Sequence, residues 1–188
     1  VIYVRSPGGT STASDVIFHE IEQYKKASNV AVVAMIGDVG ASGGYYVCLA
    51  ADEIWAHPTS ITGSVGTIFI GPKVHGLMED LGVEVTVSAS GEYKDAGSPF
   101  REETEAETAM FDEMVDDMNA RFIELTSQRR GLAPQPDVKG DWTSARIYSG
   151  NQALEVGLID QVGYLEEAIA RAKELAGIPQ ESLVVAYR

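Results

Sequence analysis

Residues 35–52, which read MIGDVGASGGYYVCLAAD, decide the fold of this chain. The apolar run at 30–36 is typical of a buried strand. It stops in a glycine-rich turn at 37–40, and the apolar residues 45–51 then predict a helix. A small hydroxyl residue, Ser42, therefore lies where a strand passes into a helix.

Two interpretations of Ser42 follow from this position. A helix start offers free backbone N–H groups and the positive end of the helix dipole, both of which favour a nucleophile. Gly43 and Gly44 would let another backbone approach it closely. Serine is also a common N-cap, a purely structural role. The stretch by itself leaves both interpretations open.

Alternating strands and helices predict an α/β fold with parallel strands. Residues 1–4, 30–36 and 52–56 are the expected strands around the turn, and residues 15–27 the helix that joins the first two. The segment 57–66 is expected to be a polar loop. Further strands are expected at 67–70, 84–88 and 183–187, and further helices at 74–81, 102–130 and 164–176.

Composition narrows the class of protein. The chain has 188 residues, of which 45% are hydrophobic, and this suits one globular domain over 1–188. Its formal net charge of −14 argues against nucleic acid and anionic lipid as partners of this surface. The single cysteine, Cys48, excludes an internal disulfide and is expected in the core. The chain begins VIYV, like the inside of a strand, which indicates a removed N-terminal portion and allows a missing membrane anchor.

A serine nucleophile needs a base to take its proton. Of the three histidines, His19 lies in the first helix, and His57 and His75 lack an evident orienting acid. A lysine kept neutral by burial is the other solution. Lys94, in the loop SGEYKDAGSP, is the best placed of the lysines, although a solvated loop lysine is the ordinary alternative. We expect the neighbouring Asp95 carboxylate to point away from it.

Five motifs together resemble the signal peptide peptidase A family of membrane-bound serine proteases, relatives of ClpP and the crotonases. The resemblance covers nearly the whole chain and rests on SPGG at 6–9, GASGGYY at 40–46, ITGSVGT at 61–67, SGEYKDAGSPFR at 90–101 and YSGNQALEVGLID at 148–160. It implies a Ser–Lys dyad of Ser42 and Lys94, with Ser64 orienting the lysine. It also implies that the amides of Gly9 and Gly43 form the oxyanion hole.

The resemblance further implies a ClpP/crotonase-like fold with repeated ββα units in a single domain. The implied activity is a serine endopeptidase that cleaves signal-peptide remnants and other short apolar or unfolded peptides, with neither a cofactor nor a metal. The implied assembly is a homo-oligomeric ring or dome. The implied location is the bacterial cytoplasmic membrane, held by an N-terminal anchor, with the catalytic domain on the extracytoplasmic side. Gly40 and Arg5 depart from the family pattern, but neither is a proposed catalytic group.

Two other functions remain open. A crotonase-type acyl-CoA hydratase or hydrolase would use the same two amides for a thioester oxyanion, but the loops show no acidic pair beyond Glu92 and Asp95, which flank Lys94. A non-catalytic peptide-binding scaffold is the second alternative, and the presence of both Ser42 and Lys94 weighs against it. Fold analogy alone does not separate these functions.

Overall fold

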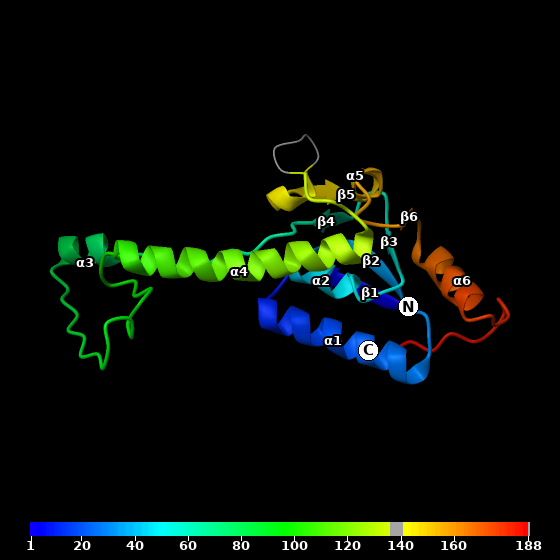
Figure 1. Cartoon of the computed structure of the whole chain (residues 1–188), viewed down its shortest axis with the longest axis horizontal. Helices are drawn as coiled ribbons and strands as arrows, with labels where there is room; N and C mark the ends of the chain where they lie inside the picture. Colours follow the sequence, from blue (N-terminus) through cyan, green and yellow to red (C-terminus); the bar gives the residue numbers. More distant parts are fainter. Residues whose placement is uncertain (136–140, 188) are drawn as a thin grey trace. The chain divides into compact units, whose positions relative to one another are not determined.

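The computed structural model describes residues 1–135 and 141–187. Within them the chain forms two compact units. Unit 1 comprises Val1–Gly66 and Ala120–Arg188, and unit 2 comprises Thr67–Asn119. The helix α4 (Glu105–Arg130) contributes residues to both units (Figure 1).

Unit 1 is built on a six-stranded sheet. The central strand β2 pairs in parallel with β1, β3 and β4, β6 pairs in parallel with β3, and β5 runs antiparallel to β4. These strands are β1 (Ile2–Ser6), β2 (Val33–Ala41), β3 (Glu53–Ala56), β4 (Ile61–Gly63), β5 (Ile147–Ser149) and β6 (Gln161–Val162). The predicted α/β fold with parallel strands is therefore confirmed.

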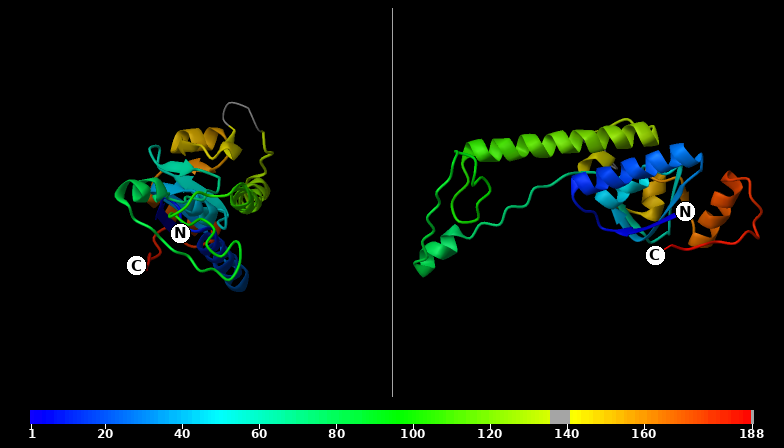
Figure 2. Two further views of the ribbon diagram at one scale, coloured as in Figure 1. Left: turned by 90° about the vertical axis from the view of Figure 1, so that its left-hand side faces the viewer. Right: turned by 90° about the horizontal axis from the view of Figure 1, so that it is seen from below.

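Strand β2 is largely buried on both faces, as its continuous apolar sequence predicts. The expectation that it stops at residue 36 in a glycine-rich turn is wrong, because β2 runs on to Ala41 and its residues 39–41 pair with β4. Ala34 and Ile36 belong to the larger core, which also contains residues of α2 (Gly43–Cys48). Val33 and Met35 face the other way and pack with α6 (Leu165–Leu175) in a second core. The sheet therefore has α2 on one face and α6 on the other (Figures 1 and 2).

Three helices meet at Tyr46, four residues after Ser42. Its hydroxyl donates a 2.6 Å hydrogen bond to Asp15 on α1 (Ser11–Ser28), and Arg121 of α4 donates to the same carboxylate oxygen. The Tyr46 ring also packs against Phe18 and Phe122, with ring centroids 5.7 and 5.0 Å away. These contacts hold α2 in place below the Ser42 turn.

The remaining elements of unit 1 are short. A 3-10 turn (Trp142–Ser144) precedes β5, and α5 (Gly150–Glu155) follows it with a capping box made by Ser149 and Gln152. The segment 57–66, expected to be a loop, contains strand β4 because three of its residues pair with the end of β2. No helix in the described residues combines the length and apolar character needed to cross a bilayer.

Unit 2 holds α3 (His75–Leu81) and the first part of α4. Helix α3 ends at Gly82 with φ 66°, the left-handed cap that its sequence predicts. The predictions of strands at 67–70 and 84–88 in unit 2, and at 183–187 in unit 1, are wrong. These described residues do not pair with any strand of a sheet. A strand needs a neighbouring strand to accept and donate the hydrogen bonds of its backbone, and these three segments have no such neighbour among the described residues.

Candidate active site

Ser42 occupies a strained turn between β2 and α2. Strand β2 ends at Ala41, α2 begins at Gly43, and Ser42 between them has φ 52° and ψ −124°. A non-glycine residue at positive φ is uncommon and persists where its surroundings enforce it, often at functional sites. The Ser42 N–H donates to the Gly63 carbonyl at 2.9 Å, which fixes this backbone.

The Ser42 side chain does not cap α2. Although Ser42 stands at the N-cap position, its hydroxyl makes no capping hydrogen bond, and it has no other hydrogen-bond partner among the described residues. Capping would normally use this oxygen as an acceptor for a helix N–H. The interpretation of Ser42 as an N-cap is therefore wrong, because its hydroxyl does not accept a hydrogen bond from the helix. This hydroxyl remains available to react with a substrate.

The loop after β1 lies directly against Ser42. A Cβ placed on Gly8, whose φ is 130°, would be 3.0 Å from the Ser42 Cβ and 3.3 Å from its Oγ. A Cβ on Gly43 would collide with the Ser14 hydroxyl and lie 3.0 Å from the Gly9 amide nitrogen. Only glycine allows these two backbones to approach so closely. Ser14, which the sequence analysis did not single out, is buried in this contact.

The amides of Gly9 and Gly43 are brought together beside Ser42. A Cβ on Gly43 would lie 3.0 Å from the Gly9 nitrogen, and a Cβ on Gly8 would lie 3.4 Å from the Gly43 nitrogen. Neither N–H has an acceptor among the described residues. Two unpaired amides next to a serine hydroxyl can stabilise an oxyanion on a carbonyl that the hydroxyl attacks.

Ser64 is the neighbour of Ser42 across the sheet. Strands β2 and β4 pair in parallel, and the last pair is Ala41 with Gly63. Ser42 and Ser64 are therefore the first residues after the ends of these two strands. Ser64 also has a positive φ, 53°, and its N–H donates to the Arg146 carbonyl at 2.9 Å. The two serines therefore leave the same edge of the sheet side by side.

Two buried hydroxyls hold this edge together. Thr62 Oγ1 donates to the Gly40 carbonyl at 2.7 Å, and Ser60 Oγ contacts the carbonyls of Ile36 and Gly37. The sequence predicted only a polar loop for these residues. The signal was the run of hydroxyl residues in HPTSITGSVG, whose hydrogen bonds to β2 become visible only when the strands pair.

Lys94 belongs to unit 2, whereas Ser42, Ser64, Gly9 and Gly43 all belong to unit 1. Lys94 lies in a turn in which its N–H donates to the Gly91 carbonyl at 3.1 Å. It is exposed, and its amine has no hydrogen bond or ion pair with the described residues. Its own unit therefore does not supply the burial that a neutral lysine needs. The pairing of Lys94 with Ser42 stays a prediction.

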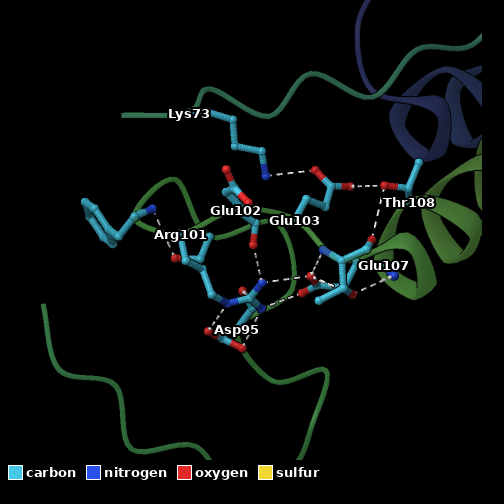
Figure 3. A network of polar contacts seen from close by, with 10 residues as sticks. Lys73, Asp95, Arg101, Glu102, Glu103, Glu107 and Thr108 are labelled. Atoms are coloured by element: carbon cyan, nitrogen blue, oxygen red, sulfur yellow. Dashed lines mark hydrogen bonds and ion pairs between the residues drawn. The ribbon is translucent and has the colours of Figure 1, made fainter. Parts of the chain in front are cut away.

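The Asp95 carboxylate points toward Arg101, as expected for a group that does not neutralise Lys94. Arg101 donates from Nε and Nη2 to its two oxygens, each at 2.9 Å (Figure 3). These hydrogen bonds hold the pKa of the Asp95 carboxyl below its ordinary value. The Asp95 carboxylate therefore makes its ion pair with Arg101 and not with the Lys94 amine.

The histidines of unit 1 make no hydrogen bond or ion pair with Ser42 in the described part of the chain. His57 Nδ1 lies 3.1 Å from the Gly163 carbonyl and its ring packs on Tyr164, while His19 is exposed on α1. His75 lies in unit 2, 3.8 Å from Glu102. In residues 1–135 and 141–187 no three His, Cys, Asp or Glu side chains are grouped as metal ligands.

Comparison with known proteins identifies the family. The family model described as "Peptidase family S49" matches residues 24–179. The chain belongs to peptidase family S49. The match covers β2, the Ser42 turn and the Lys94 loop, so the sequence resemblance to a peptidase family is confirmed.

The names of individual relatives agree with this assignment. The chain is 36% identical over 183 residues, 97% of its length, to the Synechocystis protein named "Putative protease slr0021". It is 35% identical over 174 residues, 93% of its length, to the Enterococcus faecium protein named "Putative signal peptide peptidase SppA". The alignments span 65% and 50% of these two relatives, respectively.

A solved structure supports the fold of this S49 chain. A ClpP1 mutant from Listeria monocytogenes aligns with a TM-score of 0.52 over 89% of this chain and 74% of its own, at 16% sequence identity. This likeness concerns the fold alone. It confirms the expected ClpP-like α/β architecture.

Proposed function

We propose that this chain is a serine endopeptidase in which Ser42 is the nucleophile. The observation that carries the proposal is the strained Ser42 turn, whose hydroxyl caps nothing and lies beside the unpaired amides of Gly9 and Gly43. Strand-to-helix turns of this kind present a serine hydroxyl to substrate in other hydrolases. Membership of a peptidase family supports the same reaction.

In the proposed reaction Ser42 Oγ attacks the carbonyl carbon of the scissile peptide bond, and the carbonyl oxygen becomes an oxyanion bound by the two amides. The neutral Lys94 amine accepts the hydroxyl proton and then gives it to the leaving amine. The C–N bond breaks and an acyl ester of Ser42 remains. Water, activated by the same lysine, hydrolyses this ester and regenerates the serine. Ser64, beside Ser42, orients the lysine amine.

We propose signal-peptide remnants and other short apolar or unfolded peptides as substrates. The name of the Enterococcus faecium relative supports this class. From the same family resemblance we also propose that the protein is located at the bacterial cytoplasmic membrane, with its catalytic domain on the extracytoplasmic side.

Acyl-CoA chemistry and a purely scaffolding role receive less support. Of the two acids near Lys94, Asp95 is engaged by Arg101, and both acids belong to unit 2. A scaffold has no need of a strained serine with a free hydroxyl. Neither alternative has an observation in its favour.

Labelling with a fluorophosphonate tests the proposal. The reagent phosphonylates an activated serine with loss of fluoride, so we expect one adduct per chain, located on Ser42 by peptide mass spectrometry. The Ser42→Ala variant should not be labelled. Ser64→Ala changes the adjacent serine, which also has a positive φ, and should still be labelled on Ser42, more slowly. An adduct on Ser64, or none on the folded chain while a known serine protease reacts in parallel, would remove Ser42 from this role.

We also propose self-association into a ring or dome. Unit 2 exposes several large apolar side chains, among them Ile68 and Ile70, each 77% exposed, and Leu81, 69% exposed. We propose that these side chains are part of the interface between subunits, because exposed apolar patches commonly mark such interfaces. Sedimentation at micromolar concentration should show a closed oligomer, and a monomer alone would contradict the proposal.

A further inference from the structure

Arg101 joins the Lys94 loop to the start of α4. Its guanidinium donates to both oxygens of Asp95, the residue after Lys94, and to both oxygens of Glu107 on the first turn of α4 (Figure 3). Nη1 also donates to the Glu102 carbonyl at 2.9 Å. One planar cation thus makes a fork with each of two carboxylates, a geometry that arginine provides and lysine does not.

Glu107 is the fixed end of this contact. Its side chain is only 3% exposed. Its Oε2 accepts from the Thr104 N–H at 2.8 Å, and the Glu107 N–H donates to Thr104 Oγ1 at 3.2 Å, which closes a capping box. Hydrogen bonds from Arg101, and then from Thr104, lower the pKa of the Glu107 carboxyl to about 2. The carboxylate therefore stays ionised and holds the guanidinium.

Further contacts anchor the rest of the loop within unit 2. The Val74 N–H donates to the Pro99 carbonyl at 2.8 Å. Gly97, with φ 76°, lies against Phe111, since a Cβ there would be 3.2 Å from that ring, and Phe111 stacks on Phe69 with centroids 4.2 Å apart. Asp95, Gly97 and Pro99 are thus all anchored, whereas the amine of Lys94 has no hydrogen bond or ion pair with any residue that the structure describes.

Other charges near the loop are already paired or exposed. Lys73 Nζ pairs with Glu103 at 2.8 Å (Figure 3). His75 Nε2 lies 3.8 Å from a carboxylate oxygen of Glu102. Glu92 is exposed two residues before Lys94. The charged residues of the loop besides Lys94 are Glu92, Asp95 and Arg101, and Arg101 links the loop to Glu107. Asp95 is the one next to the lysine in sequence, and Arg101 decides where its carboxylate points.

We propose that Arg101 is a positioning residue for the base: anchored by Glu107, it holds the Asp95 carboxylate away from Lys94 and fixes the turn that presents the lysine. This inference rests on the proposed role of Lys94. Without the guanidinium, the Asp95 carboxylate is free to turn to the Lys94 amine and to stabilise its charged form, which cannot accept a proton.

The test changes Arg101 and Glu107 together, because removing Arg101 alone would strand a buried carboxylate. In Arg101→Gln/Glu107→Gln, we expect kcat at neutral pH to fall about tenfold through the misplaced base, with KM changed much less. The pH of half-maximal activity should rise by about half a unit or more, from the attraction of a nearby carboxylate. Adding Asp95→Asn should return this pH to that of the parent protein.

A matched control makes the same chemical change elsewhere. Arg171 on α6 bridges Glu53 and Glu174, also two carboxylates, and Arg171→Gln/Glu53→Gln should leave the pH profile unchanged. Unfolding midpoints of all variants report whether the fold is intact. An unshifted profile in the double variant, or a shift that Asp95→Asn does not reverse, would overturn the inference.

A chemical readout separates this inference from the proposed function. Acylation of the Lys94 amine by an N-hydroxysuccinimide ester, followed by mass spectrometry, requires the neutral amine but no catalysis. At fixed pH we expect slower acylation in the double variant and recovery in the triple variant. An unchanged acylation rate would overturn the role of Arg101 even if Lys94 is the base. Full activity in Lys94→Met would instead refute the proposed function, whatever the acylation rates.

Discussion

Replacing Ser42 with glycine should abolish peptide hydrolysis and raise the free energy of unfolding by about 1 kcal/mol. Loss of the nucleophile costs several orders of magnitude in kcat, as in other serine proteases. The gain in stability arises because serine is strained at φ 52° and glycine is not, a difference of about 1–3 kcal/mol that the extra freedom of unfolded glycine partly offsets. Peptidase assays and urea unfolding measure the two effects.

Two variants separate strain from chemistry. Ser42→Ala should be as inactive as Ser42→Gly but without the gain in stability, because alanine is strained at the same backbone angles. Ala145→Gly relieves a positive φ of 57° at an exposed position and should increase stability with activity unchanged. Residual hydrolysis within a few-fold of the parent in Ser42→Ala would contradict the nucleophile assignment. A Ser42→Gly protein less stable than Ser42→Ala would contradict the strain.

Lys94→Arg should be inactive even though it keeps the positive charge. A guanidinium does not deprotonate in the working range of pH, so it cannot take the Ser42 proton. For the parent protein we expect activity to rise with pH and stay high in mildly alkaline buffer, since only the neutral amine is a base. A pH–rate profile of kcat/KM checks both statements.

The control for this prediction is the other lysine of unit 2. Lys73 makes an ion pair with Glu103 that arginine can replace, so Lys73→Arg should keep both activity and profile. The prediction fails if Lys94→Arg remains active. A profile limited near pH ~6.5, the ordinary range of histidine, and lost in His57→Ala or His75→Ala would identify a different base.

Local sequence patterns were sufficient for the elements around the site. The continuous apolar run before Ser42 predicted β2, and Gly82 marked the end of α3, because burial and left-handed caps leave clear signatures in a few consecutive residues. Motif order was sufficient for the peptidase family, which the match over 24–179 shows. The close approach of Gly43 to another backbone was also expected, and the Gly9 loop provides it.

The tertiary structure decided what depends on partners distant in sequence. The runs at 67–70, 84–88 and 183–187 have strand-like sequences but form no strand, since hydrogen bonding in a sheet requires a second segment. Conversely, β4 forms inside an expected loop because β2 offers it an edge. The positive φ of Ser42 also depends on such a partner, since the Ser42 N–H donates to the Gly63 carbonyl. The fork from Arg101 joins residues only six positions away, Asp95 and Glu107, but it forms only because the folded loop brings them together. Residue types and spacing determined which chemical groups this protein carries, whereas strain, pairing and charge placement arose only when the folded chain brought those groups into contact.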